Sequence, residues 1–395
     1  MPRFLVLNGP NLNLLGRREP EIYGSTTLHE LYQMCAQWGF ALGAEVDAFQ
    51  SNHEGEIIDR LHEARGTMDG IILNAGALTH YSYAIHDALV AVGIPTVEVH
   101  ISNVKEREPW RTVSVVEAAC VHTVYGRGIE GYRWALQHLA ARLAGPFEIV
   151  RYGPDPQQVA DLRVPEAPGP HRMVVLIHGG FWKNQWTRDL MDGLAVDLRS
   201  QGLATLNVEY RRLGSAGGWP NTALDVATAI DQIAEVQHAD IDVSRVSVVG
   251  HSAGGLLALW AAGRHQLTDG PGADPRVSPA LAVGLAPVSD MAFAQAHDLG
   301  DGAADAFLAS AHEHTNLYRS SSPIDMLPLS TPQLIVHGSE DDAVPVSMSD
   351  GYVEAARILG DEVEFYRLES TDHMELIDPH SDAWRQTKEF LLANL

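Results

Sequence analysis

Cysteine is scarce in this sequence, with only Cys35 and Cys120 in 395 residues. Two cysteines so far apart provide neither a disulfide framework nor a paired set of metal ligands. Basic residues are also few, 27 against 51 acidic ones, which gives a formal net charge of −24. That excess of negative charge repels nucleic acid and anionic membranes. We therefore expect a cytoplasmic protein with no metal, no nucleic acid and no membrane as partner.

Long apolar runs are missing too, since no stretch approaches the roughly 20 residues that span a bilayer. The amino terminus MPRFLVLNGPNLN becomes polar by Asn8, so it does not read as a signal peptide. Apolar residues nevertheless make up 45% of the chain, enough for each domain to bury a core. At about 100 to 200 residues per domain, the length predicts two or three domains.

The composition changes near Gly145, where we place a domain boundary. Six prolines fall in the stretch GPFEIVRYGPDPQQVADLRVPEAPGP, for which we expect a linker and entry strands over 146–170. Within it, FEIVRY and VADLRV alternate enough to pair as a hairpin. The first 145 residues carry 11 basic and 16 acidic residues, a charge of −5, and the remainder carries 16 and 35, a charge of −19. The acidity therefore belongs mainly to the second domain, over 171–395, where it favours solubility.

Short β-branched runs alternate with helix-length segments through the first domain, at FLVLN, AEVDAF, GIILN, TVEVH and HTVYG. This alternation predicts an α/β fold, a parallel sheet with crossover helices. Thr27 and Glu30 have the spacing of a capping box and predict that a helix begins there. About 18 residues separate the first strand from that helix, and a loop of this length in a compact domain is usually functional.

Polar residues gather directly after three of the predicted strands of the first domain. Asn11, Arg18 and Tyr23 follow the first, in NGPNLNLLGRREPEIYG, while LNAGALTH and EVHIS follow two others. In open α/β sheets, ligands bind at the carboxyl ends of the strands. An arginine close to a phenol favours the phenolate, so Tyr23 is a candidate base, and His100 is a candidate acid. These clusters predict a site for a small anionic ligand.

Residues 3–143 resemble type II 3-dehydroquinate dehydratase through NGPNLNLLGRREPEIYG, FQSNHEGEIIDRLHEA, LNAGALTHYSYAIHDAL and EVHISNVKEREPWR, in this order. The resemblance implies a flavodoxin-like doubly wound parallel sheet. It also implies removal of water from 3-dehydroquinate through an enolate, giving 3-dehydroshikimate without cofactor or metal. The type I enzyme uses a Schiff-base lysine, and the only lysine of this domain is Lys105.

The resemblance also assigns a role to individual residues. It implies that Tyr23 removes the C2 proton, that Arg18 activates Tyr23, and that His100 protonates the leaving C1 hydroxyl. Asn11 is implied to hold a water on the developing enolate oxygen, where charge appears in the transition state. The positions implied to hold the substrate carboxylate and ring hydroxyls are Asn74, His80, Ile101, Ser102 and Arg111.

Assembly is a further implication of the resemblance. Asp87 matches a family residue that reaches the active site of a neighbouring subunit, which implies a homo-oligomer built from trimers, commonly a dodecamer. Arg107 is implied to be structural. His86 stands where the family usually has an arginine, so the resemblance does not decide the contact between subunits. It also leaves open whether the physiological role is biosynthetic or catabolic.

The second domain carries a G-x-S-x-G motif, GHSAG, between the apolar strand RVSVV and the helical segment GLLALWAA. That context is required of a nucleophile elbow, and it makes Ser252 the candidate nucleophile. Asp341, with Asp342 as a rival, and His373 follow in the chain order of an α/β-hydrolase triad. The glycine-rich loop HGGFW predicts an oxyanion hole made by the backbone N–H groups of Gly180, Phe181 and Ala253.

The segment from Arg151 to the carboxyl terminus resembles the α/β-hydrolase fold. The pairing of HGGFW with GHSAGG is similar to the kynurenine formamidase and carboxylesterase branch. Residues from about 290 to 328 are expected to form a small cap that selects the substrate. The whole chain thus reads as a bifunctional enzyme, a dehydratase joined to a serine hydrolase of an unknown ester or amide. The alternative is a hydrolase oligomerised by a catalytically silent dehydratase-like scaffold.

Overall fold

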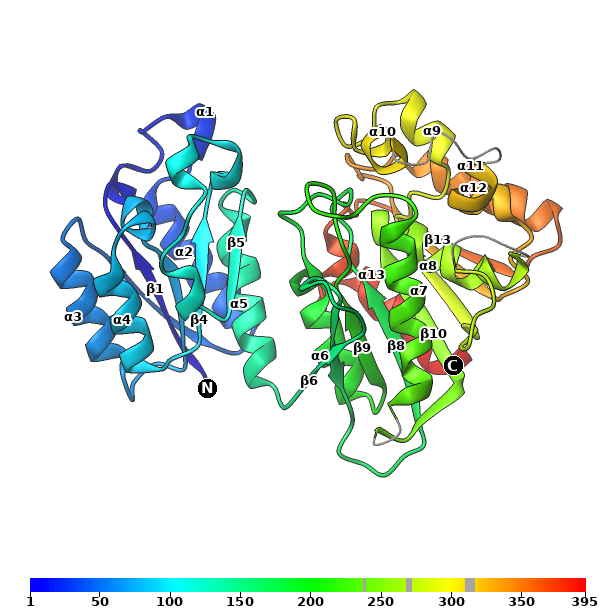
Figure 1. The fold of residues 1–395 in the computed structure, drawn as a ribbon, viewed down its shortest axis with the longest axis horizontal. Helices are drawn as coiled ribbons and strands as arrows, with labels where there is room; N and C mark the ends of the chain where they lie inside the picture. Colours follow the sequence, from blue (N-terminus) through cyan, green and yellow to red (C-terminus); the bar gives the residue numbers. More distant parts are fainter. Residues whose placement is uncertain (237–238, 268–271, 310–316) are drawn as a thin grey trace. The chain divides into compact units, whose positions relative to one another are not determined.

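The computed structural model describes residues 1–236, 239–267, 272–309 and 317–395. The chain folds into two compact units, Met1–Gly145 and Pro146–Leu395, each with its own sheet (Figure 1). In the described part of the chain, no helix is both long and apolar enough to cross a membrane.

The first unit contains a five-stranded parallel sheet of order β2-β1-β3-β4-β5. This is the flavodoxin-like order, so the predicted fold class is confirmed. The strands are β1 (Arg3–Asn8), β2 (Glu45–Gln50), β3 (Gly70–Asn74), β4 (Thr96–His100) and β5 (His122–Tyr125). The helices are α1 (Pro20–Tyr23), α2 (Leu28–Ala41), α3 (Glu54–Ala64), α4 (Tyr83–Val92) and α5 (Glu130–Leu143).

Helices cover both faces of this sheet, as the figure shows (Figure 1). One apolar cluster joins the sheet to α2 and α5, and a second joins it to α3 and α4. The capping box predicted at Thr27 is present, because the Thr27 side chain accepts from the Glu30 N–H while the Glu30 carboxylate accepts from the Thr27 N–H. The ends of the parallel strands are therefore held on a rigid, two-sided core.

The second unit contains an eight-stranded sheet of order β13-β12-β11-β10-β8-β9-β7-β6. The predicted hairpin of β6 and β7 pairs antiparallel and joins the parallel part through β9. The strands are β6 (Glu148–Arg151), β7 (Val159–Arg163), β8 (His171–Ile177), β9 (Ala204–Val208), β10 (Ile241–His251), β11 (Leu281–Leu285), β12 (Gln333–Gly338) and β13 (Val363–Leu368). The last of these, β13, was absent from the sequence prediction.

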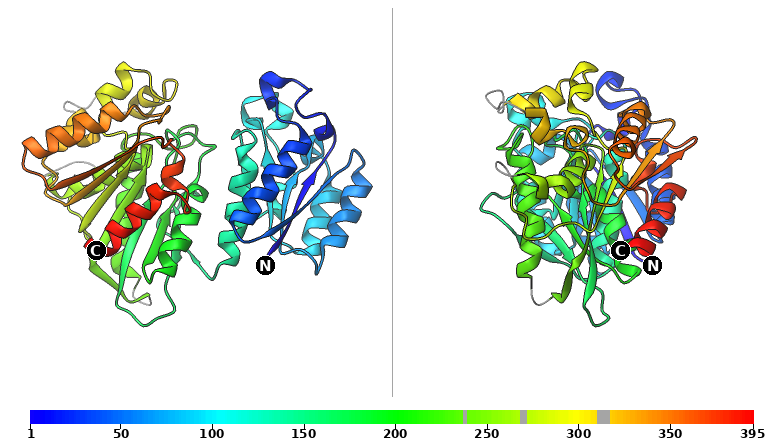
Figure 2. Two further views of the ribbon diagram at one scale, coloured as in Figure 1. Left: turned by 180° about the vertical axis from the view of Figure 1, so that it is seen from behind. Right: turned by 90° about the vertical axis from the view of Figure 1, so that its right-hand side faces the viewer.

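Helices again lie on both faces of the second sheet, with α7 and α8 in front in Figure 1 and α13 in front when the molecule is seen from behind (Figure 2). Asp197 of α6 accepts hydrogen bonds from Trp384 and Lys388 of α13, which ties these two helices together. The helices are α6 (Asp192–Ser200), α7 (Asn221–Gln232), α8 (Ala253–Gly263), α9 (Met291–Ala296), α10 (Ala303–Leu308), α11 (Leu317–Ser321), α12 (Val346–Ile358) and α13 (Asp382–Asn394).

Two segments singled out in the sequence take a definite form. The predicted loop between β1 and α2 is partly helical, because it contains a 3-10 turn at Leu12–Leu14 and the helix α1. The segment proposed as a cap holds α9, α10 and α11 in its described parts. Its residues 310–316 lie outside the described residues.

Candidate active sites

A cavity of about 100 Å³ lies at the carboxyl ends of β1, β3 and β4. The structure brings together there nearly every residue that the sequence assigned to the first site. The cavity is lined by Asn11, Arg18, Tyr23, Asn74, His80, His100, Ile101, Ser102, Arg107 and Arg111, with six further residues. Asp87 is the exception, because it is exposed on α4 and does not line the cavity of its own chain.

Tyr23 ends the short helix α1, which begins with Pro20 and is followed by Gly24 with a φ of 78°. Two guanidinium groups lie near its ring, with the Cζ atoms of Arg18 and Arg107 at 5.3 and 5.7 Å from the ring centroid. Arg107 also donates a hydrogen bond of 2.8 Å from Nη1 to the Tyr23 hydroxyl. The residue taken as structural from the sequence therefore contacts the candidate base directly.

His100, the last residue of β4, is held by a buried carboxylate on the same strand. Its Nε2 lies 2.9 Å from Oε1 of Glu98, which also accepts from the hydroxyls of Thr79 and Ser114. Burial alone would raise the pKa of Glu98, but these hydrogen bonds and the charge of His100 lower it. A carboxylate fixed in this way orients the imidazole.

A hydrogen-bonded network beneath the cavity orients Asn74. The Tyr132 hydroxyl donates to Oδ1 of Asn8 at 2.6 Å and accepts from Nδ2 of Asn74 at 2.9 Å. Above it, Gly9 is needed for close approach of two loops, since a Cβ there would lie 2.5 Å from the Ala75 carbonyl oxygen. Asn11 adopts a left-handed conformation with φ of 68°.

The remaining residues of the first site form a cationic and aromatic wall. His80 stacks near the ring of His100 and meets Trp110 edge to face at 5.1 Å between centroids. Burial lowers the pKa of His80, so its imidazole is biased towards the neutral form. The Arg111 guanidinium lies 4.0 Å from the Trp110 ring centroid and pairs with Glu108. The wall suits an anion that also offers hydroxyl groups.

In the second unit, Ser252 joins β10 to α8 in the sharp turn predicted for a nucleophile elbow. Its φ of 56° and ψ of −120° are strained for a residue with a side chain. A Cβ on Gly250 would lie 2.0 Å from the Gly254 carbonyl oxygen, and one on Gly254 would lie 2.2 Å from that of Ile177. Both glycines are therefore required by the turn.

His373 and Asp341 meet beside this turn. Nδ1 of His373 lies 2.6 Å from Oδ2 of Asp341, whose other oxygen accepts from the N–H groups of Ala343 and Val344. Burial would raise the pKa of Asp341, but hydrogen bonds from His337 and His373 lower it well below its ordinary value. Asp342, the rival in the sequence, is exposed.

The loop after β8 lies against Ser252, since a Cβ on Gly179 would come within 2.8 Å of the Ser252 Cβ. Gly180 has a φ of 102°, followed by 48° at Phe181 and 57° at Trp182. Nε2 of His251 lies 3.0 Å from the carbonyl oxygen of His373, so the residue before the candidate nucleophile holds the backbone of the candidate base. Among the described residues, no group of three or more candidate ligands could hold a metal ion.

Each unit is similar to a known protein family. A family model described as dehydroquinase class II matches residues 2–140. The catabolic 3-dehydroquinase 1 of Neosartorya fischeri is 54% identical over 136 residues, which are 34% of this chain and 91% of that protein. The chain belongs to the class II dehydroquinase family. The 3-dehydroquinate dehydratase 2 of Pseudomonas putida is also 54% identical, over 142 residues, 36% of this chain and 95% of that protein. The first unit is thus a dehydroquinase domain.

The second unit has the α/β-hydrolase fold. A family model described as BD-FAE matches residues 161–355. A truncated carbohydrate esterase from gut microbiota superposes with a TM-score of 0.54 and 19% identity, over 63% of this chain and 96% of that one. The identity is low, so this likeness establishes the fold. The chain therefore joins a dehydroquinase domain to a domain with the α/β-hydrolase fold.

The sequence placed Glu98 in a polar cluster but gave it no role, and it indicated only a structural role for Arg107. Glu98 lies two positions before His100 on one strand, and side chains two apart share a face, so this partner was within reach of the sequence. Arg107 contacts Tyr23 from 84 residues away. Nothing in the spacing of the sequence signals that contact.

Proposed function

We propose that the dehydroquinase domain removes water from 3-dehydroquinate to give 3-dehydroshikimate. The observation that carries the proposal is the convergence of Tyr23, Arg18 and His100 on one small polar cavity. The hydrogen bond from Arg107 to the Tyr23 hydroxyl adds to it, because a donated charge-assisted bond stabilises negative charge on that oxygen.

In this proposal Tyr23 removes the C2 proton, and the electron pair left on C2 delocalises into the adjacent ketone as an enolate. Asn11 holds a water on the enolate oxygen, which stabilises charge where it develops. Collapse of the enolate expels the C1 hydroxyl, which His100 protonates so that it leaves as water. Asn74, His80, Ile101, Ser102 and Arg111 hold the carboxylate and the ring hydroxyls. No cofactor or metal takes part.

For the second domain we propose serine hydrolase activity towards an ester or an amide. Ser252 attacks the carbonyl carbon, His373 takes the serine proton and returns it to the leaving group, and Asp341 orients the imidazole. The N–H groups of Gly180, Phe181 and Ala253 receive the oxyanion. The contact of His373 with Asp341 at 2.6 Å supports this assignment.

Two single-site variants test both halves together. Tyr23→Phe removes the proposed base, and Ser252→Ala removes the proposed nucleophile. We expect the first to abolish dehydration and preserve ester hydrolysis, and the second to do the reverse. Equal loss of both activities in either variant contradicts independent sites. Esters of quinate and shikimate, N-formylkynurenine and simple acyl esters are the panel for defining the hydrolase substrate.

We further propose that the dehydroquinase domain assembles the chain into a homo-oligomer built from trimers, with Asp87 directed to a neighbouring subunit. The exposed position of Asp87 on α4 is consistent with such a contact. The competing proposal, a silent scaffold that only oligomerises the hydrolase, predicts assembly without any dehydration. Sedimentation of the intact chain tests the assembly that both proposals expect. Dehydration by the wild-type chain that is absent in Tyr23→Phe distinguishes the two.

A further inference from the structure

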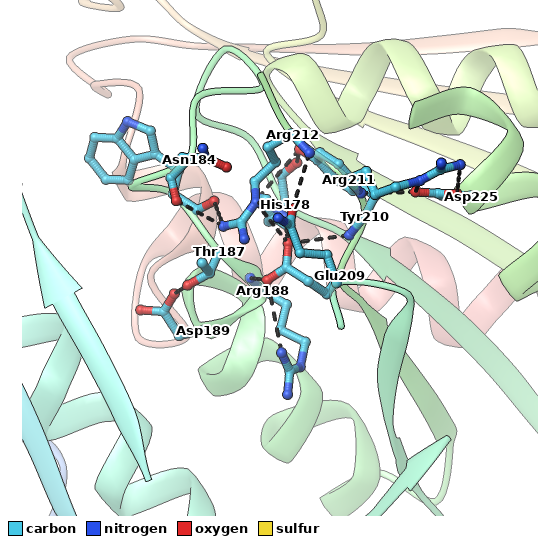
Figure 3. Close-up of polar contacts among 12 residues, drawn as sticks. His178, Asn184, Thr187, Arg188, Asp189, Glu209, Tyr210, Arg211, Arg212 and Asp225 are labelled. Carbon is cyan, nitrogen blue, oxygen red and sulfur yellow. Dashed lines mark hydrogen bonds and ion pairs between the residues drawn. The ribbon is translucent and has the colours of Figure 1, made fainter. Parts of the chain in front are cut away.

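Glu209 is a buried carboxylate immediately after β9, beside the loop that follows β8 (Figure 3). Its two oxygens contact opposite ends of that loop. Oε1 lies 3.0 Å from Nε2 of His178, the first residue of the loop, and Oε2 accepts from the N–H of Arg188 at 3.1 Å. One side chain therefore contacts both ends of the segment 178–188. This segment contains Gly180 and Phe181, two of the proposed oxyanion donors.

The charge of Glu209 is compensated by cations on both sides. Nε of Arg212 lies 3.4 Å from Oε1, and Nη1 of Arg188 lies 3.9 Å from Oε2. Burial by itself would raise the pKa of this carboxyl, but the charges of Arg212 and His178 lower it to about 2. Arg212 also donates to the carbonyl oxygens of Asn184 and Trp186 at 3.0 and 2.7 Å, within the same loop.

His178 passes this constraint to the peptide next to Ser252. Its Nε2 faces the Glu209 carboxylate, and its Nδ1 lies 2.8 Å from the Gly179 carbonyl oxygen. The ring is therefore held between two oxygen atoms, one on the Glu209 side chain and one on the Gly179 backbone. The ring also stacks on Tyr210 at 4.2 Å between centroids, and the Tyr210 hydroxyl donates to the His178 carbonyl oxygen.

The Gly179 carbonyl and the Gly180 N–H belong to one planar trans peptide, in which the two groups point in opposite directions. Fixing the carbonyl on the His178 ring therefore fixes the direction of the Gly180 N–H. Gly180, Phe181 and Trp182 have φ values of 102°, 48° and 57°. Such strained backbone conformations persist only where the surrounding structure holds them.

We propose that Glu209 is a positioning residue for the oxyanion hole, acting through His178 on the Gly179–Gly180 peptide. This inference rests on the proposed hydrolase activity of Ser252. Glu209 itself contacts neither the substrate nor the reacting atoms. Its removal leaves Ser252, His373 and Asp341 in place but loosens a donor that acts mainly in the transition state.

The test compares Glu209→Gln with Asp231→Asn in the intact chain. Asp231 is a matched control, because its carboxylate also pairs with a buried arginine, Arg264, and accepts from backbone N–H groups, those of Arg276 and Val277. With p-nitrophenyl acetate, we expect Glu209→Gln to lower kcat about 10- to 100-fold, since loss of an oxyanion donor costs about 100- to 1,000-fold. KM should change less than about threefold, and Asp231→Asn should retain kcat within about twofold.

A trifluoromethyl ketone gives a second readout that loss of stability alone does not move. It forms a tetrahedral adduct with the serine oxygen, so its inhibition constant should rise in parallel with the loss of kcat/KM in Glu209→Gln. His178→Gln should reproduce the defect, and the double variant should be no worse than either single one, because the two residues act as one unit. If Glu209→Gln does not fold, His178→Gln carries the same comparison.

The inference is overturned if Glu209→Gln or His178→Gln matches Asp231→Asn in kcat, or if ketone inhibition stays unchanged while kcat falls. A different result concerns the proposed function itself. A folded wild-type chain that neither hydrolyses p-nitrophenyl acetate nor reacts with a fluorophosphonate at Ser252 refutes the serine hydrolase, and this inference with it.

Discussion

The guanidinium of Arg107 donates a hydrogen bond of 2.8 Å to the hydroxyl of Tyr23. Burial alone would lower the pKa of Arg107, but this bond and the electrostatic interaction with Tyr23 raise it. The candidate base thus has a permanent cation on its reacting atom, in addition to Arg18 beside its ring. Two guanidinium groups far apart in the sequence therefore lie around one phenol ring.

The first prediction follows from this contact. Arg107→Lys keeps the charge but loses the planar geometry of the donor. A hydrogen bond to a charged group is worth about 1.5 to 3 kcal/mol, so we expect dehydration to slow about 10- to 100-fold. Arg17→Lys, on an exposed residue of the loop that carries Tyr23, is the control and should leave the rate unchanged. Equal rates for the two variants would contradict a role for Arg107.

The second prediction concerns the carboxylate that holds His100. Glu98→Gln keeps the size of the side chain but removes the negative charge that contacts the His100 imidazole. We expect kcat for dehydration to fall about 10- to 100-fold, because a charge-assisted bond becomes a neutral one. Steady-state kinetics measures kcat, and thermal unfolding of the same variant shows whether the fall in kcat reflects a loss of stability. Glu117→Gln, on an exposed residue nearby, should keep the wild-type kcat. An equal fall of kcat in both variants would contradict a specific role for Glu98.

The third prediction separates the two neighbouring aspartates of the hydrolase domain. Asp341→Asn deprives His373 of its charged partner and should lower kcat for ester hydrolysis about 10⁴-fold, as expected when a triad acid becomes an amide. Asp342→Asn should change the rate less than twofold. The measurement is p-nitrophenyl acetate hydrolysis by both variants. The reverse order of effects would assign the triad acid to Asp342.

The fourth prediction is a dependence of stability on pH. The pKa of Glu209 is lowered to about 2 from an ordinary 4.5. Its ionised form therefore stabilises the fold above about pH 4.5, and that stabilisation disappears as the pH falls towards 2. Its size is on the order of 3 kcal/mol. Urea unfolding of wild type and Glu209→Gln should differ most at neutral pH and converge only as the pH approaches 2. A difference that is constant with pH would contradict the assignment.

Much of the fold could be predicted because periodicity and turn residues are local properties of the sequence. Every strand of the first sheet coincides with a predicted run, as do β6, β7 and β10 of the second, and the capping box at Thr27 begins its helix as expected. β13 was missed because VEFYRL lies at the sheet edge, alternates poorly and carries two charges. An edge strand needs burial on fewer sides, so its pattern is weaker.

The candidate sites were predictable where chemistry follows a strand end, as with Ser252 and His100. The partners were harder to predict because they depend on which strands are neighbours. Glu209 meets His178 only because β8 and β9 lie side by side in register. No spacing in the sequence specifies that pairing, so the carboxylate next to the proposed oxyanion loop emerged from the structure alone.

The central claim is that the first domain is an active dehydratase and not a scaffold. It is tested most directly by mixing the purified intact chain with 3-dehydroquinate and following the ultraviolet absorbance of the conjugated enone acid, with Tyr23→Phe as the control. The account predicts an absorbance that rises with the wild-type chain and stays flat with the variant. A flat trace from folded, oligomeric wild-type protein would contradict it and leave the hydrolase domain as the seat of function.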